Sequence, residues 1–257
     1  MLKSNFYSTS LFSPNRIVAL LALGGVLTTT ALCASPHATK QAHTATTLSA
    51  PQGAIVLFSG KADEVAKHWV KRYSDKPATW SIRDGAMVAG GGDIASKEEY
   101  ANFHLHLEFK VPLLPNAKGQ ARGNSGIGLH SRYEVQILDS YGINPPGTGD
   151  CGAVYNQSAP LVNASKPPKE WQSYEIIFRA PRFDASGKKT ENPRVTVIQN
   201  GMVVQNNQEI PNMTGIQFSQ YKEMSKTGQI VLQDHGCQVE FRNVWILPLP
   251  AQGDPHY

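Results

Sequence analysis

The stretch FHLHLEFKV, residues 103–111, decides the fold class of this chain. Its apolar residues (Phe, Leu, Leu, Phe and Val) alternate strictly with His, His, Glu and Lys. Successive side chains of a β-strand point to opposite faces, so this alternation predicts a strand with one face in a core and the other face outward. It is the clearest strand signal in the sequence.

Further strand signals recur on both sides of this stretch, separated by Gly, Pro and Asn. The segments that we expect to be strands are 54–58, 80–83, 86–89, 125–129, 133–138, 174–179, 194–199, 202–205, 229–233 and 239–247. Asp84-Gly85 and Asn200-Gly201 are dipeptides typical of two-residue hairpin turns, and each lies between two of these segments. Helical periodicity is weak, and only residues 62–69 are expected to form a short helix.

These short strands with turns between them predict an all-β fold, most simply an antiparallel β-sandwich of the jelly-roll type. The chain has 257 residues, and β folds of this length often form one domain. We expect a signal peptide over residues 1–35, a flexible leader over 36–50 and a single jelly-roll domain over 51–250.

The signal peptide is predicted from the order of residue types at the N-terminus. Lys3 and Arg16 precede an apolar run over 17–27, and small residues follow it. The run is too short for a convincing transmembrane helix. We therefore expect an exported protein, periplasmic or secreted, with no transmembrane segment once the signal is removed.

Composition and motifs exclude several classes of function. The net charge is +4 and the basic residues are scattered, with no basic stripe among aromatic residues, so nucleic acid is not an expected partner. The sequence has no Gly-x-Ser-x-Gly elbow, no P-loop and no dinucleotide fingerprint. Cys151 and Cys237 could form a disulfide in an exported protein or could be free thiols. The sequence leaves the oligomeric state open.

The stretch GNSGIGLHSRYEVQILD, residues 123–139, carries the polar groups that best suit a ligand site. In a regular strand Glu134 and Gln136 share the face opposite to their apolar neighbours. Asp139 falls out of phase with them unless a bulge adds a residue. Acids and amides on one face can bind sugar hydroxyls and transfer protons, although an ordinary amphipathic strand has the same pattern.

Other polar groups give weaker signals. His235 follows an apolar strand, where it could exchange protons or could simply bond a carbonyl in a turn. His104, His106 and Glu108 share the outward face of their strand, and the two histidines could bind zinc, although a solvated face is the simpler interpretation for all three. Tyr155 could stack on a sugar ring or belong to the core. The loop over residues 141–150, rich in Pro and Gly, is a candidate wall or lid of a site.

Taken together, these segments resemble a known family. The motifs that carry the resemblance, in chain order, are Trp80…Asp84-Gly85, Phe103-x-Leu-x-x-Glu108-Phe, Gly123-Asn-Ser-Gly-Ile, Arg132-Tyr-Glu-Val-Gln-Ile-Leu-Asp139, Gly152-Ala-Val-Tyr155, Trp171-x-x-Tyr-Glu-Ile, Asn200-Gly201, Leu232-Gln-Asp-His-Gly236 and Phe241-Arg-Asn-Val-Trp245. Over residues 53–249 the chain resembles the 3-keto-disaccharide hydrolase domain family of exported bacterial proteins. The resemblance implies a concanavalin/laminarinase-like jelly roll with a carbohydrate site on its concave face.

The resemblance also implies action on glycosides that carry a ketone at C3. The ketone acidifies the hydrogen on C2, a base removes it, and the group on C1 leaves by elimination. Water can then add to the product, which gives net hydrolysis. Such an enzyme, a hydrolase or lyase of 3-keto-glycosides or 3-keto-disaccharides, needs a base, a donor for the enolate oxygen and an acid for the leaving group.

Within that chemistry we hypothesise Glu134 or His235 as the base, Gln136 and Asn124 as donors to the enolate, and Asp139 as orienter or acid. The residues expected to bind substrate are Asn124, Ser125, Arg132, Tyr155, Gln233 and Glu108. No cofactor is certain, but a divalent metal ion could replace the enolate donors, with Glu134 and His235 as candidate ligands.

Two alternatives stay open. Jelly-roll glucanases carry Glu-x-Asp-x-x-Glu on one strand, and here the equivalent residues are Glu134, Gln136 and Asp139. A conventional retaining glycosidase that uses Glu134 and Asp139 is therefore the first alternative. The second is a non-catalytic carbohydrate-binding module that holds sugar through Tyr133, Tyr155 and Trp171.

Overall fold

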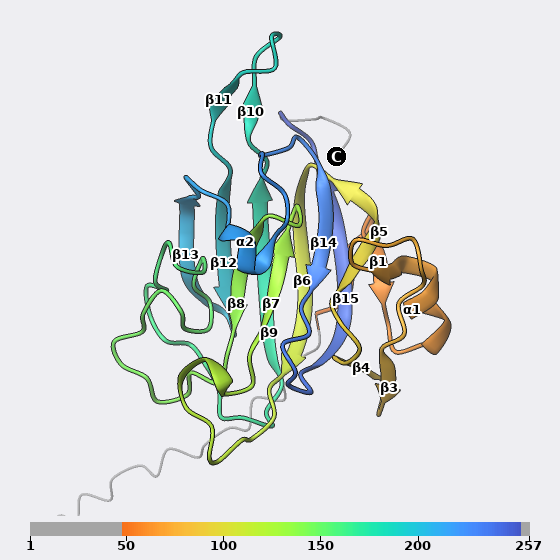
Figure 1. Cartoon of the computed structure of the whole chain (residues 1–257), viewed down its shortest axis with the longest axis vertical. Coiled ribbons are helices and arrows are strands. Elements are labelled where there is room, and N and C mark those ends of the chain that lie inside the picture. The colour runs from red at the N-terminus through yellow and green to blue at the C-terminus, as the bar shows by residue number, and fades with distance from the viewer. Residues whose placement is uncertain (1–47, 253–257) are drawn as a thin grey trace, which may run out of the picture. The chain divides into compact units, whose positions relative to one another are not determined.

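The computed structural model describes residues 48–252, apart from the side chains of Ile216 and Gln217 (Figure 1). The predicted signal peptide and most of the predicted leader lie outside the described residues, so these boundaries and the export that follows from them stay predictions. Within the described part, no helix has both the length and the apolar character needed to cross a membrane.

Two antiparallel sheets carry almost all of the regular structure (Figure 1). The larger sheet contains, in spatial order, β13 (Met202–Glu209), β12 (Arg194–Gln199), β9 (Gln172–Arg179), β6 (Asn102–Lys110), β15 (Glu240–Leu249), β4 (Ala86–Val88) and β3 (Ser81–Arg83), with β1 (Ile55–Phe58) also paired to β15. The smaller sheet contains β2 (Trp69–Lys71), β5 (Ile94–Tyr100), β14 (Gly228–Leu232), β7 (Ser125–Leu129) and β8 (Tyr133–Ile137).

The remaining elements are short. They are the hairpin of β10 (Arg182–Phe183) and β11 (Lys189–Glu191), the helices α1 (Ala62–His68) and α2 (Gly215–Phe218), and the 3-10 turn η1 (Gly119–Ala121). The predicted all-β antiparallel sandwich of the jelly-roll type is confirmed, and the predicted helix is present as α1.

The core lies between the inner faces of the two sheets, and alternation along single strands builds it. In β6, Phe103, Leu105, Leu107 and Phe109 are all fully buried, as the alternation predicts. In β8, the two apolar neighbours of Gln136 are buried in the same cluster. Burial of this apolar surface is the main stabilising contribution to the fold.

Both predicted hairpin turns are present. Asn200 and Gly201 have φ of 52° and 82°, and they connect β12 to β13. Asp84 and Gly85 have φ of 51° and 74°, and they connect β3 to β4. Two successive positive φ values give the turn twist that matches antiparallel strands, and Asn, Asp and Gly tolerate that region best.

The sequence missed four strands, of which β2 and β5 belong to the smaller sheet. β2 begins directly after α1, at the last residue of the segment predicted to be helix, and it has three residues. In β5 a run of buried residues is followed by a run of exposed ones, so no period of two marks it. The structure also answers the open question about the cysteines, because Cys151 and Cys237 are free thiols.

Candidate active site

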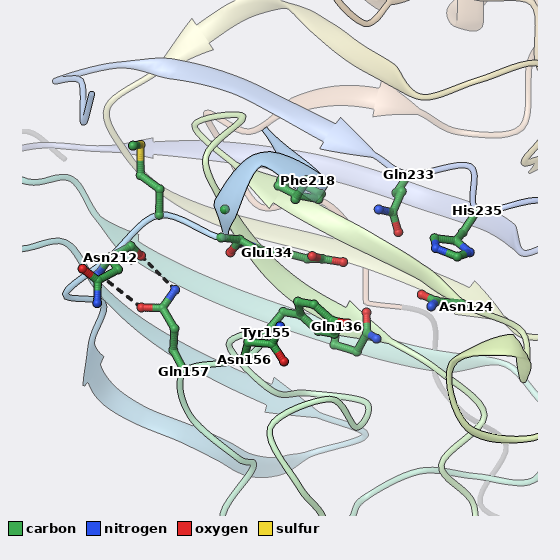
Figure 2. A pocket seen from close by; sticks show the side chains of 13 residues that line it. Asn124, Glu134, Gln136, Tyr155, Asn156, Gln157, Asn212, Phe218, Gln233 and His235 are labelled. Atoms are coloured by element: carbon green, nitrogen blue, oxygen red, sulfur yellow. Dashed lines mark hydrogen bonds between the residues drawn. The ribbon is translucent and has the colours of Figure 1, made fainter. Parts of the chain in front are cut away.

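A pocket of about 780 Å³ opens on the face of the smaller sheet that points away from the core (Figure 2). A pair of glycines in β7 creates its floor, because Gly126 and Gly128 lie opposite Gln136 and Glu134. A Cβ atom at Gly126 would lie 3.0 Å from Cδ of Glu134, and one at Gly128 would lie 2.7 Å from Cζ of Phe218. The absence of side chains at these two positions therefore leaves room both for the acid and for a ligand.

One wall of the pocket comes from residues 212–218, a segment that includes α2. Figure 1 shows α2 in front of β7 and β8. The Thr214 hydroxyl accepts a hydrogen bond from the backbone N–H of Glu134 at 2.9 Å. Phe218 packs into a small apolar cluster with residues of β5 and β14, which closes one end of the pocket.

Glu134 is the acid of this pocket. It is 4% exposed, and its carboxyl has no hydrogen-bond partner among the described residues. Burial raises the pKa of Glu134 to about 8, against an opposing effect of the Arg72 charge and with a further increase from Asp93. Figure 2 shows the carboxyl pointing between Gln233 and Gln136. A buried and unpaired carboxyl whose pKa lies near neutral pH is suited to proton transfer.

An ion pair behind the pocket connects Glu134 to the turn that carries His235. Arg72 Nη1 lies 3.0 Å from Oδ2 of Asp93, and the Arg72 side chain is 5% exposed. Oδ1 of Asp93 accepts a hydrogen bond from the backbone N–H of Asp234 at 2.9 Å. His235 follows in the chain, is exposed, and lines the pocket. The same carboxylate therefore both sets the charge near Glu134 and holds the His235 turn.

Three side-chain amides form a connected group at one side of the pocket. Gln136 donates from Nε2 to Oε1 of Gln120 at 2.8 Å and more weakly to the carbonyl of Gly149 at 3.3 Å. Asn124 donates from Nδ2 to the backbone carbonyl and to Oε1 of Gln120, at 2.9 and 3.1 Å. The predicted loop wall over residues 141–150 thus reaches the site through the Gly149 carbonyl.

The structure brings together six of the predicted site residues and leaves four outside the pocket. The six residues that line it are Asn124, Glu134, Gln136, Tyr155, Gln233 and His235. Ser125 lies beneath it, fully buried, and its hydroxyl donates to the Gln233 carbonyl at 2.7 Å. The other three, Asp139, Arg132 and Glu108, take part in contacts elsewhere.

Asp139 follows the end of β8 and turns away from the acid of the pocket. Its Oδ2 lies 3.0 Å from Nη2 of Arg122, and the β7–β8 pairing runs from Ser125 to Leu129 without a bulge. The bulge that would align Asp139 with Glu134 is therefore absent from this pair of strands.

Arg132 holds the wall segment rather than lining the pocket. Its Nε donates to the Glu223 carbonyl at 2.6 Å, and its guanidinium carbon lies 4.1 Å from the centroid of the Tyr221 ring. Its own carbonyl accepts from the Thr214 N–H at 2.9 Å. The Arg132 guanidinium therefore attaches residues 214–223 to the start of β8.

Glu108 lies on the outer face of the larger sheet, in a separate polar cluster. Its Oε2 is 2.6 Å from Nε of Arg242. Nearby, Nε2 of His104 lies 2.6 Å from Oε2 of Glu175, and Nδ1 of His106 contacts the other oxygen of Glu175. His106 and Glu108 are buried, so the expected solvated face is wrong for these two residues.

The aromatic residues proposed for a binding module do not form one surface. Tyr133 is fully buried in the core. Trp171 is covered by Arg242, whose guanidinium carbon lies 4.0 Å from the ring centroid, and by Lys110 at 4.8 Å. Tyr155 alone of the three lines the pocket.

Several residues of the site carry no sequence signal. They are the wall residues Asn156, Gln157, Asn212, Met213, Thr214 and Phe218, the supporting pair Arg72 and Asp93, and Gln120 in η1. They lie in loops, in the four-residue helix α2 or in η1, and none of these is long enough to show a period. The Gly-x-Gly spacing in β7 is the signal that could have indicated a hollow floor.

The donor set for a metal ion is limited. Among the described residues, no group of three or more His, Cys, Asp and Glu side chains could hold a metal ion. Glu134 and His235, the candidate ligands, both line the pocket. A metal there would need the amide oxygens of Gln136 and Gln233, which have no partner, to complete its coordination.

A buried acid, an imidazole and several amides line a hollow on a jelly-roll sheet, and this arrangement suits a polar ligand such as a carbohydrate. Comparison with known proteins agrees with this interpretation. Residues 53–247 match the family described as the 3-keto-alpha-glucoside-1,2-lyase-like domain, and the chain belongs to that family.

Solved structures of similar proteins come from Parabacteroides distasonis ATCC 8503, and each is provisionally named a glycosyl hydrolase. One is 41% identical, covers 79% of this chain and 89% of its own, and superposes with a TM-score of 0.71. A second is 23% identical, with coverage of 77% and 94% and a TM-score of 0.57, and it shows the shared fold. The comparison with curated proteins found no match.

Proposed function

We propose that this protein cleaves the glycosidic bond of 3-keto-glycosides by removal of the C2 proton and elimination. One observation carries the proposal: of the described residues that line the pocket, Glu134 is the single carboxylic acid and His235 the single histidine. A retaining glycosidase needs two carboxyl groups about 5 Å apart, and Asp139 is paired with Arg122 instead. Elimination next to a ketone needs one base and one proton donor.

The proposed reaction consists of proton removal, elimination and addition of water. The Glu134 carboxylate takes the C2 hydrogen as a proton, and the electrons of the C–H bond form the C2–C3 double bond of an enolate. The enolate then reforms the C3 ketone as the C1–C2 double bond forms and the C1–O bond breaks. The departing oxygen takes a proton, and addition of water across C1–C2 completes a net hydrolysis.

We assign the base to Glu134 because burial strengthens a carboxylate as a base, and its raised pKa matches this role. His235 is exposed at the pocket, where it can protonate the leaving oxygen. The donors hypothesised for the enolate need revision, because the amide nitrogens of Gln136 and Asn124 already donate to Gln120. The Tyr155 hydroxyl is the candidate that replaces them.

The test uses a 3-keto-α-glucoside with a chromogenic leaving group, beside the unoxidised glucoside and a keto substrate with deuterium at C2. We expect release from the keto sugar alone and slower release from the deuterated one. Release from the plain glucoside would contradict the proposal in favour of a conventional glycosidase. Binding of the keto sugar without release would favour a binding module.

A second arm repeats the keto assay with a chelator and with added divalent ions. Loss of activity with the chelator and its return with a metal would assign the enolate to an ion held near Glu134 and His235. Export remains a separate prediction, and the N-terminal sequence of the protein recovered from the cells and from the medium tests it.

A further inference from the structure

The hydrogen bonds of Gln120 determine which end of each neighbouring amide faces the pocket. A backbone carbonyl can only accept. The Gly149 carbonyl accepts from Nε2 of Gln120 at 2.9 Å, so Oε1 of Gln120 must point toward Gln136 and Asn124. The backbone carbonyl of Gln120 accepts from Nδ2 of Asn124 in the same way. Two backbone oxygens therefore fix all three amides in one orientation.

The consequence is that Gln136 and Asn124, whose N–H groups are used within the protein, offer their amide oxygens to a ligand. The Gln136 side chain is fully buried, and its Oε1 has no partner. In Figure 2 the Gln136 oxygen points toward the side of Glu134 while its nitrogen points away. A buried acceptor without a donor costs about 1–3 kcal/mol, which a ligand hydroxyl could recover.

We propose that Gln120 is a positioning residue that makes this side of the pocket a surface of hydrogen-bond acceptors, selective for ring positions that carry a free hydroxyl. The wall of Gln136 and Asn124 binds the hydroxyl-bearing edge of the sugar. The ketone, which can only accept, lies away from that wall. This inference rests on the proposed function, since it orients the same substrate in the same pocket.

Fluorine tests this arrangement because it replaces a hydroxyl in size but cannot donate a hydrogen bond. The probes are methyl α-glucoside and its deoxyfluoro analogues at C2, C4 and C6, with binding to the full chain followed by NMR titration. For the wild type we expect at least one analogue to bind about tenfold more weakly than the parent sugar, because an acceptor of the wall loses its donor.

Two substitutions at Gln120 distinguish its effect on the orientation of the neighbouring amides from a general effect on the fold. Gln120→Glu keeps an oxygen for the amides of Gln136 and Asn124, so we expect the tenfold ratio to persist. Gln120→Met keeps the length but removes the side-chain oxygen, which leaves the Gln136 amide with only its 3.3 Å bond to the Gly149 carbonyl while the Gln120 backbone still holds Asn124, so the part of the ratio due to Gln136 is lost and the ratio should fall to about twofold or less. Gln120 is exposed in η1, and the exposed Gln52, outside the pocket, offers Gln52→Met as a control that leaves the ratio unchanged.

The inference is overturned if every fluoro analogue binds the wild type as well as the parent sugar, or if Gln120→Met keeps the ratio. The keto-glucoside assay is run on the same preparations, so the two ideas can fail separately. If the keto sugar is cleaved but Gln120→Met leaves the ratio of the binding constants unchanged, only the role of Gln120 is rejected. If Gln120→Met changes the ratio but the keto sugar is not cleaved, only the elimination chemistry is rejected. If the protein neither binds the sugars nor cleaves the keto sugar, both proposals are rejected.

Discussion

Two glutamates on opposite sheets differ in what their oxygens contact. On the larger sheet, both oxygens of Glu175 are occupied by His104 and His106. Burial alone would raise its pKa, but these hydrogen bonds outweigh burial and lower it. On the smaller sheet, the Glu134 carboxyl has no such partners, and burial raises its pKa to about 8. Hydrogen bonding to the charged form decides whether a buried or half-buried acid is held as a structural anion or is available for proton transfer.

The largest expected effect comes from Glu134→Gln, which removes the unpaired acid at nearly constant size. We expect kcat/KM on the 3-keto substrate to fall by about 10²–10⁴-fold, the usual contribution of a positioned base. Steady-state release of the chromogenic group measures it, and thermal unfolding should show an intact fold. A variant that is folded and keeps full activity would remove Glu134 from the mechanism.

Gly126→Ala tests whether the absence of a side chain in the pocket floor positions the Glu134 carboxyl. The added Cβ would press on the Glu134 carboxyl, so the acid must move and the rate should fall by about 10–100-fold, since small misplacement of reacting groups is costly. Gly90→Ala is the matched control, because a Cβ there meets nothing within 4 Å. Equal activity of the two alanine variants would show that the floor does not position the acid.

Asp93→Asn is expected to have a smaller effect, on pH dependence. The variant removes a negative charge that raises the pKa of Glu134 and leaves the opposing Arg72 charge unpaired. The pKa of Glu134 should therefore fall, and the activity profile should shift toward lower pH. The Asn oxygen can still accept from Asp234, so the His235 turn is kept. A profile that does not move would mean that Asp93 acts on structure alone.

Glu175→Gln should change activity least, by about twofold or less, since the larger sheet does not line the pocket. It should lower the free energy of unfolding at neutral pH by about 1–3 kcal/mol, because His104 or His106 loses a partner. The folded-state pKa of Glu175 lies below its ordinary value of 4.5, so its stabilisation is present above that pH and is lost as the pH falls through the folded value. Denaturant unfolding of both proteins at several pH values measures this loss, and a large loss of activity in a stable variant would show that Glu175 is more than a structural anion.

Local patterns in the sequence account for much of the fold and for the main polar face of the site. The alternation over residues 103–111 and the turn dipeptides predicted strands and hairpins, because period and positive φ are local properties. The same period placed Glu134 and Gln136 together on one face, as the structure does. Their roles in catalysis stay predictions.

Contacts between segments that are distant in the chain could not be predicted from the sequence. The Asp139–Arg122 pair and the attachment of Arg132 to Tyr221 depend on long side chains that meet only after the sheets form. The wall over residues 212–218 has no periodic pattern, since it is built from a four-residue helix and loops. The orientation of the Gln136 amide depends on two backbone carbonyls that the fold brings close, so residue identity alone suggested a donor where the structure presents an acceptor.

The pH dependence of kcat/KM of the wild type on the 3-keto substrate is the most direct test of Glu134 as the base. If Glu134 acts as the base, it must lose its proton, so the rate should rise with pH and level off above about 8, the pKa that burial gives this group. A rate that falls as the pH rises through about 8 would make Glu134 the acid and His235 the base. A flat profile across that range would contradict the account, because the unpaired carboxyl would then take no part in the reaction.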